Sequence, residues 1–176
     1  MRNRHGVLEM TVVVADTSPL NYLALIGEIG ILQRLYGRVV VPSEVLAELA
    51  DSGAPPEVAA WIQSRPEWLE VRAVRVGQDD PALQQLDPGE RAAILLAQEE
   101  PDVLLLIDDS AGRAEANRRD IPNTGTLGVL RAAALRRLLD LPPALARLAA
   151  TNFRVSRSLI EDLLAEDSER KRRIAE

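Results

Sequence analysis

The sequence contains no cysteine and a single histidine among its 176 residues. Disulfide bonds and cysteine-based zinc sites are therefore excluded. The one histidine, His5, lies in the leading segment, which disfavours histidine-dependent triads and histidine-rich metal sites. Any catalytic chemistry must use carboxylates, hydroxyls, lysine or arginine side chains, or a cofactor.

Aromatic residues make up only 3% of the chain, and no apolar run reaches the roughly 18–20 residues that a membrane helix needs. Hydrophobic residues still make up 47%, so leucine, alanine, valine and isoleucine must build the core of a globular protein. The first ten residues lack the apolar centre of a signal peptide, so we expect a soluble, cytoplasmic protein with no membrane partner. The net charge of −6 argues against a broadly basic DNA-binding surface, but local arginines can still hold phosphates.

Continuous apolar runs predict buried strands: TVVVA at residues 11–15, RVVV at 38–41 and VLLLI at 103–107. The alternating segment LEVRAV at 69–74 predicts an edge strand. Helices are predicted over residues 18–26, in a short segment ending near 36, and over 42–50, 55–64, 87–99, 110–119, 127–139, 142–150 and 156–166. This alternation predicts an α/β protein, a three-layer α/β/α sandwich with a mostly parallel sheet.

Local signals set several boundaries within this pattern. Ser18 before Pro19 is typical of a helix cap, and Asp87-Pro88-Gly89-Glu90 is a capping-box start. Residues 122–125 are predicted to form a turn. Met10 directly precedes the first strand, so we expect residues 1–10 to be a leader, unfolded or untranslated, before a single domain. That domain should span residues 11–168 and be followed by a charged tail at 169–176.

Acidic side chains gather where the predicted strands end and where the helices that follow begin. Because the carboxyl ends of parallel strands lie at one edge of a sheet, acids from separated segments can converge there. Carboxylates without histidine or cysteine suit hard cations such as Mg²⁺ or Mn²⁺, and two such ions can activate water against a phosphodiester. The acids concerned are Asp16, Glu44, Glu48, Glu90, Asp108 and Asp109.

Each acid taken alone also has a structural interpretation. Asp16 and the Asp108-Asp109 pair can cap helices, and Glu90 fits the capping box. Glu44 and Glu48 share a helix face at i, i+4 spacing, which usually means solvated charges, and the spacing leaves open which of them faces the site. Their joint placement at strand ends is what favours a site.

These segments resemble PIN domains. VVADTSPLNYLALIG is similar to the first PIN segment, and VVVPSEVLAELA resembles the second, in which the glutamate of a V-x-x-E-L pattern reaches the site. LDPGERAAILLAQE and VLLLIDDSAGRAEANRRDIPNTGTLGVL are similar to a bacterial and archaeal subgroup with G-E, I-D-D and G-T-x-G-x-L motifs. The resemblance covers roughly residues 11–139.

The resemblance implies an endoribonuclease that depends on Mg²⁺ or Mn²⁺ and has RNA as its substrate. Many relatives are VapC-like toxins, which are neutralised by a small antitoxin protein and often form homodimers. Carried over position by position, it implies that Asp16, Glu48, Glu90 and Asp108 are catalytic, metal-binding acids, with Asp109 as a further ligand. Typical VapC-like toxins have aspartate where this chain has Glu90.

Five further residues are candidates for substrate binding. Thr17 and Ser18 can orient Asp16 or cap the helix, and Asn21 lies one turn further on. Arg113 can clamp a phosphate or pair with an acid. Thr126 lies in a glycine-containing turn that can form a phosphate nest, although helix capping is the stronger prediction for it.

Competing functions make distinct demands on the sequence. A dinucleotide site needs G-x-G-x-x-G after the first strand, and an aspartyl phosphotransferase needs Asp-x-Asp there; neither is present. A non-catalytic PIN-like module that binds RNA or protein remains the alternative. If the acids do meet, their repulsion should raise at least one pKa, and metal binding should stabilise the fold.

Overall fold

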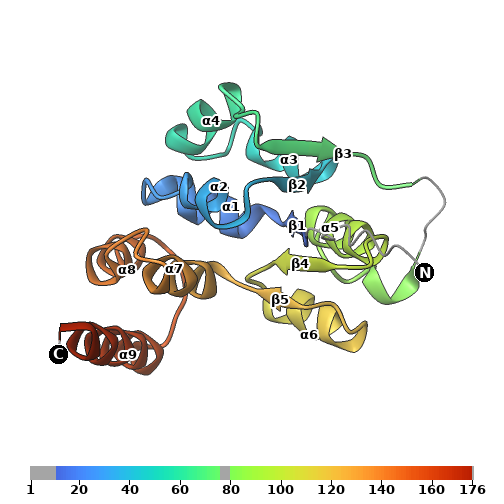
Figure 1. Cartoon of the computed structure of the whole chain (residues 1–176). Helices are drawn as coiled ribbons and strands as arrows, with labels where there is room; N and C mark the ends of the chain where they lie inside the picture. Colours follow the sequence, from blue (N-terminus) through green and yellow to red (C-terminus); the bar gives the residue numbers. More distant parts are fainter. Residues whose placement is uncertain (1–10, 76–79, 176) are drawn as a thin grey trace, which may run out of the picture.

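The computed structural model describes residues 11–75 and 80–175 (Figure 1). Its centre is a parallel sheet with the strand order β3-β2-β1-β4-β5. The strands are β1 (Val12–Ala15), β2 (Val39–Pro42), β3 (Leu69–Arg72), β4 (Val103–Leu106) and β5 (Asn123–Thr124). The three predicted buried strands and the predicted edge strand are confirmed.

At least one helix lies between each pair of successive strands. Those between β1 and β3 are α1 (Thr17–Leu25), α2 (Ile31–Tyr36), α3 (Ser43–Leu49) and α4 (Pro56–Gln63). The short 3₁₀ turn η1 (Pro81–Leu83), α5 (Pro88–Gln98) and α6 (Ser110–Arg118) follow. The chain ends with α7 (Thr126–Leu135), α8 (Leu141–Ala149) and α9 (Arg157–Ala175).

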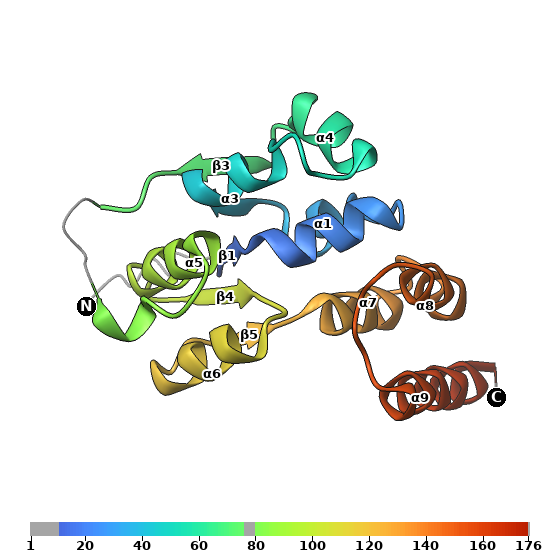
Figure 2. The ribbon, with the colours of Figure 1, turned by 180° about the vertical axis from the view of Figure 1, so that it is seen from behind.

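Alternate residues of β1 face two different cores. Val13 and Ala15 pack into a larger core with residues of α1, α2, α7 and α8, whereas Val14 packs into a second core with α5 and α6. Helices therefore cover both faces of the sheet, which confirms the three-layer α/β/α prediction. Figures 1 and 2 show, from opposite sides, α7, α8 and α9 gathered beyond the carboxyl ends of β4 and β5.

The register of the central strands sets the edge on which the acids meet. Ala15 of β1 is paired with Leu106 of β4, and the backbone N–H of Asp16 donates to the carbonyl of Leu106 at 2.9 Å. Since both strands run in the same direction, Asp16 and Asp108 leave the sheet at the same edge.

Two predicted boundaries near that edge are wrong. The first helix begins at Thr17 with Asp16 in the cap position, because the Ser18 hydroxyl donates instead to Asp108. The predicted turn at 122–125 contains β5, because the N–H of Ile107 donates to the carbonyl of Thr124 at 2.9 Å and so adds a strand to the sheet.

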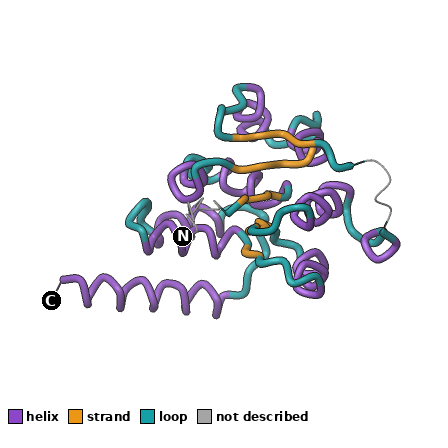
Figure 3. The backbone as a smooth tube through the Cα atoms, turned by 45° about the vertical axis from the view of Figure 1, so that its right-hand side comes forward, coloured by secondary structure: helices purple, strands orange, loops and turns teal. Residues whose placement is uncertain are grey.

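The last helix is longer than predicted, because α9 continues beyond residue 166 to Ala175 (Figure 3). Ion pairs at i, i+3 and i, i+4 spacing, such as Asp167 with Lys171 and Glu169 with Arg173, support the added turns. The predicted leader at 1–10 and residues 76–79, between the edge strand and the helix at 87–99, lie outside the described residues. No helix in the described ranges has both the length and the apolar character required to cross a bilayer.

Candidate active site

The first turn of α1 links three segments that are distant in sequence. Thr17 Oγ1 donates a hydrogen bond to Glu48 Oε2 on α3. The next hydroxyl, Ser18 Oγ, donates to Asp108 Oδ2 after β4 at 3.1 Å. Consecutive hydroxyls at the start of α1 therefore hold two of the predicted acids close enough to Asp16 to act on its charge.

The start of α7 holds the carboxylate of Asp108. The backbone N–H of Thr126 donates to Oδ1 at 2.7 Å, and the Thr126 hydroxyl donates to Oδ2 at 2.6 Å. A β-carbon on Gly125 would lie 2.6 Å from Oδ1, so only glycine leaves room for the carboxylate there. The cap residue of α7 is Gly125, so the prediction that Thr126 caps this helix is wrong. The carboxylate faces the positive end of the helix dipole, a favourable arrangement for an anion.

The start of α5 holds Glu48 in a similar way. The backbone N–H of Gly89 donates to Glu48 Oε1 at 3.0 Å, and a β-carbon on Gly89 would lie 2.7 Å from that oxygen. The adjacent Glu90 completes the predicted capping box by accepting the N–H of Asp87 at 3.3 Å. One turn of α5 thus brings two acidic side chains to the same region.

Asp16 differs from the other buried acids among the described residues. It is 3% exposed, and its Oδ1 has no hydrogen-bond partner there. Glu115 is also buried, but it pairs with Arg119 at 2.6 Å, and the buried Asp167 pairs with Lys171 at 2.7 Å. Burying a carboxylate without a positive partner is costly, so Asp16 requires either a proton or a cation.

The pKa of Asp16 is raised from its ordinary value of 3.8 to about 7. Burial is the largest cause, and the backbone N–H of Thr17 opposes it. Repulsion from Glu90, Glu48 and Asp108 raises the pKa further. The four predicted catalytic acids therefore share one electrostatic environment.

The pKa of Glu90 is likewise raised, from 4.5 to about 7. Burial is again the largest cause, followed by repulsion from Asp109, and the charges of Asp87 and Glu48 add to it while a backbone hydrogen bond opposes it. The expectation of at least one raised pKa is confirmed. Desolvation, rather than the repulsion on which the expectation rested, is its main cause.

Of the two glutamates on α3, only Glu48 joins this group. Glu44 is exposed and lines a different hollow beside Pro88 and Arg91. Asp109 caps α6, because its Oδ1 accepts the N–H groups of Ala111 and Gly112 at 2.9 and 3.0 Å. Its exposed side chain also lines the cleft that contains Asp108.

Two open clefts flank the first turn of α1, because consecutive residues of that helix face different sides, whereas residues four apart share a face. One cleft is lined by Thr17, Asn21 and Glu48 together with the loop between α3 and α4. The other is lined by Ser18, Tyr22, Glu90, Asp108, Asp109, Asn152, Phe153 and Arg154. Asn21 thus lies beside Glu48, on the opposite side from Asp108. The exposed Arg113 has its Nη1 only 3.5 Å from the β-carbon position of Gly125, which places it near Asp108.

The sequence analysis did not single out Tyr22, Asn152, Phe153 or Arg154. The last three lie in the loop between α8 and α9, about 130 residues from α1, and the Tyr22 hydroxyl donates to Asn152 Oδ1 at 2.9 Å. No spacing or motif in the chain indicates that pairing. It arises because α7 and α8 lead the chain back over the carboxyl edge of the sheet.

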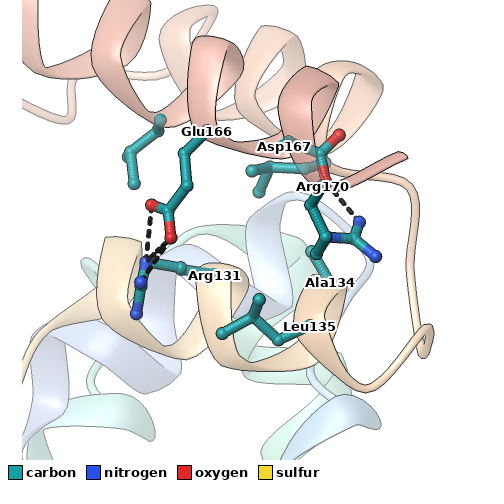
Figure 4. Close-up of a pocket in the computed structure, with 8 residues that line it drawn as sticks. Arg131, Ala134, Leu135, Glu166, Asp167 and Arg170 are labelled. Atoms are coloured by element: carbon teal, nitrogen blue, oxygen red, sulfur yellow. Dashed lines mark hydrogen bonds and ion pairs between the residues drawn. The ribbon is translucent and has the colours of Figure 1, made fainter. Parts of the chain in front are cut away.

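A further hollow lies between α7 and α9 and is distinct from the acidic group (Figure 4). Arg131 of α7 donates to Glu166 Oε2 of α9 at 2.8 Å, and the nearby Asp167 accepts a hydrogen bond from Arg170 (Figure 4). Leu135 lines the hollow beside them. These contacts attach α9 to the domain.

Within residues 11–75 and 80–175, no three acidic or histidine side chains converge closely enough to hold a metal ion. The chemistry of the group nevertheless fits a hard cation, since its donors are carboxylate oxygens. The unpartnered Oδ1 of Asp16 and the raised pKa values of Asp16 and Glu90 also suit this group to binding a cation.

Comparison with known families agrees with this geometry. Residues 12–169 match a family model described as a PIN domain. The chain therefore belongs to the PIN-domain family, whose members are generally nucleases that use divalent metal ions. No curated protein matches the chain.

Proposed function

We propose that this PIN domain is an endoribonuclease that depends on Mg²⁺ or Mn²⁺ and acts through Asp16, Glu48, Glu90 and Asp108. One observation carries the proposal. Asp16 is a buried carboxylate with an oxygen that lacks a partner among the described residues, and three other acids add to its negative environment. The other buried acids of the described chain are neutralised by arginine or lysine.

A divalent cation at this group would supply the charge that stabilises the reacting phosphate and helps water to lose a proton. The residues of the chain orient the acids for that task. Thr17 and Gly89 hold the two oxygens of Glu48, and Thr126 holds both oxygens of Asp108. Since Thr126 has no exposed surface, it would position Asp108 rather than contact the substrate.

Four further polar side chains near the acids would contact the metal ion or the RNA. Asp109 is an additional ligand, because its second oxygen is not used in capping α6. Arg113 is a phosphate clamp, because it is exposed beside Gly125. Ser18 and Asn21 face the two clefts through which an RNA chain would approach.

The biological setting rests on the resemblance to VapC-like toxins. We propose that the chain is the toxin of a toxin–antitoxin pair, that it acts on cytoplasmic RNA as a homodimer, and that a small antitoxin neutralises it. The family assignment supports the nuclease activity that such a toxin requires.

Cleavage of a labelled, unstructured RNA tests the proposal directly. The purified chain should cut the RNA with Mg²⁺ or Mn²⁺ and not with EDTA. Asp16→Asn and Asp108→Asn should lower the rate by about 100-fold or more, because each removes a charge that the transition state needs. The matched control is Glu44→Gln, an acid of α3 that lies outside the group and should cleave at the wild-type rate. Wild-type cleavage by Asp16→Asn would refute the assignment.

The second candidate is a PIN-like module that binds RNA or protein without cutting it. It is favoured by the fact that no three acids of the described residues converge to hold a metal. Titration calorimetry with MnCl₂ separates the candidates. Heat of binding that disappears in Asp16→Asn supports the nuclease, and its absence from the wild-type protein supports the binding module.

A further inference from the structure

One of the two clefts beside the acids has an aromatic wall. We call it the aromatic cleft; it is lined by Ser18, Tyr22, Glu90, Asp108, Asp109, Asn152, Phe153 and Arg154. The rings of Tyr22 and Phe153 meet edge to face, with centroids 4.8 Å apart and an interplanar angle of 80°. Two of the few aromatic side chains in the protein therefore lie directly beside the proposed catalytic acids.

The loop that carries Phe153 is held in place by its own hydrogen bonds. The Thr151 hydroxyl donates to the carbonyl of Leu148 at 2.6 Å and accepts the N–H of Phe153 at 3.1 Å. Tyr22 donates to Asn152, and both rings pack partly against the larger core. The aromatic wall is therefore formed before any ligand binds, which lowers the entropy cost of binding.

Arg154 is the positively charged side chain of this cleft. It is exposed, and within the described ranges its guanidinium has no ion-pair or hydrogen-bond partner. Burial raises the pKa of Tyr22, the charge of Asp108 raises it further, and Arg154 opposes them. The Tyr22 hydroxyl thus lies within the influence of both the proposed metal-binding acid and the arginine.

The cleft on the other side of α1 has none of these features. The described residues that line it include Thr17, Asn21, Glu48 and Asp51, and neither an aromatic side chain nor an arginine or lysine is among them. Of the two clefts, only the aromatic cleft therefore offers both aromatic rings and a positive charge beside the acids.

We propose that the aromatic cleft binds an unpaired nucleotide next to the scissile phosphate, with Arg154 on a phosphate and the base against Tyr22 and Phe153. The inference rests on the proposed function, because it places the substrate of that same site. Aromatic side chains bind bases through their faces, which a duplex hides, so the cleft selects single-stranded RNA over duplex RNA. The net charge of −6 repels a polyanion overall, and Arg154 supplies a local positive charge that can attract one to this cleft.

Fluorescence anisotropy with a fluorescein-labelled oligouridylate tests the phosphate contact. Titrations are run in EDTA, and a gel verifies that the RNA stays intact. Arg154→Ala should weaken binding about tenfold, because a charge-assisted hydrogen bond is lost. It should also reduce the slope of log K against log salt by about 0.7, the value for one phosphate contact on a single strand.

The matched control is Arg157→Ala, which removes the same charge three residues away. Arg157 is exposed, pairs with Glu161 and does not line the cleft. The RNA affinity and the salt slope of Arg157→Ala should therefore equal those of the wild type. Equal affinities for the Arg154 and Arg157 variants would overturn the proposal. Because both arginines are exposed, neither substitution threatens the fold.

The base contact is tested with an oligonucleotide that carries 2-aminopurine, whose fluorescence is quenched by stacking on a ring. Phe153→Leu keeps an apolar side chain but removes the ring, and should weaken single-strand binding about fivefold and relieve the quenching. Tyr22→Phe keeps the ring and loses only the bond to Asn152, so it should still quench. A blunt duplex that binds as tightly as the single strand, and loses as much affinity in Phe153→Leu, would refute selection of unpaired bases.

Failure of this inference can be told apart from failure of the proposed function. If Asp16→Asn still cleaves RNA but Arg154→Ala binds RNA weakly, the catalytic assignment fails and the proposed role of the aromatic cleft is supported. If Asp16→Asn abolishes cleavage and Arg154→Ala binds like Arg157→Ala, the nuclease stands and the cleft proposal fails.

Discussion

Replacing Asp16 by asparagine should stabilise the metal-free protein at neutral and alkaline pH. Asp16 is 3% exposed, and its pKa is raised from 3.8 to about 7, chiefly by burial. The folded state therefore holds the proton more tightly than the unfolded state does. As the pH rises from 3.8 to about 7, ionisation of Asp16 progressively lowers the free energy of unfolding. Asparagine fills nearly the same volume and does not ionise.

The size of the effect follows from the difference between the two pKa values. A shift from 3.8 to about 7 corresponds to roughly 4 kcal/mol once the pH exceeds both values. At pH 4 the same shift contributes less than about 1 kcal/mol. For a chain of 176 residues, the difference at high pH corresponds to roughly 10 °C in Tm.

Thermal unfolding followed by circular dichroism in EDTA, from about pH 4 to pH 8, measures this difference. The Tm of Asp16→Asn should exceed that of the wild type increasingly as the pH rises. Added Mg²⁺ or Mn²⁺ should raise the Tm of the wild type and leave the variant unchanged. Asp162→Asn is the control, since Asp162 is exposed on α9. The reasoning would be refuted if Asp16→Asn were less stable than the wild type at pH 8 without metal.

Two further predictions concern positions outside the acid ligands. Gly125→Ala should lower the cleavage rate by about 100-fold with the fold intact, because the new methyl group would lie 2.6 Å from Asp108 Oδ1 and displace that carboxylate. Gly30→Ala is its control, since nothing lies within 4 Å of the added carbon, and equal RNA cleavage rates for the two variants would contradict the prediction. Asp167→Asn should destabilise the protein by roughly 1–2 kcal/mol at pH 7, as measured by urea unfolding. Burial raises the pKa of Asp167, but hydrogen bonds from Lys171 and Arg170 outweigh it and hold the pKa below its ordinary value. The stability lost in Asp167→Asn should therefore shrink as the pH falls below 3.8. A loss of stability that does not depend on pH would contradict the ion-pair explanation.

Much of the fold could be predicted because its strands are buried on both faces. Runs such as VVVA and VLLL have no polar residue to place at a surface, so they must lie within the sheet. Parallel pairing then carries the residues after each strand to one edge, which is why Asp16 and Asp108 could be placed together from sequence. The resemblance to PIN domains, now supported by the family match, rests on the same segments.

Other elements depend on contacts between distant segments. β5 spans only Asn123–Thr124, and it is a strand because β4 offers it a free edge. Ser18 precedes a proline and matches a capping signal, yet its hydroxyl bonds to Asp108, because that carboxylate lies beside it only in the folded chain. Local propensity is a weak guide where a tertiary partner competes for the same group.

The sequence by itself determined the chemistry of the site, an acidic group in a chain that has no cysteine and a single histidine. It also determined the order, along the chain, of the strands that carry the acids. The helical spacing left both Glu44 and Glu48 open, and only the tertiary structure shows that Glu48 lies with the other acids, since it alone meets Thr17 and Gly89. The tertiary structure also decided that Tyr22, Phe153 and Arg154 share a cleft. The physical reason is that the chemistry of each side chain depends only on the identity of that residue, whereas burial and proximity depend on how all the helices pack around the sheet.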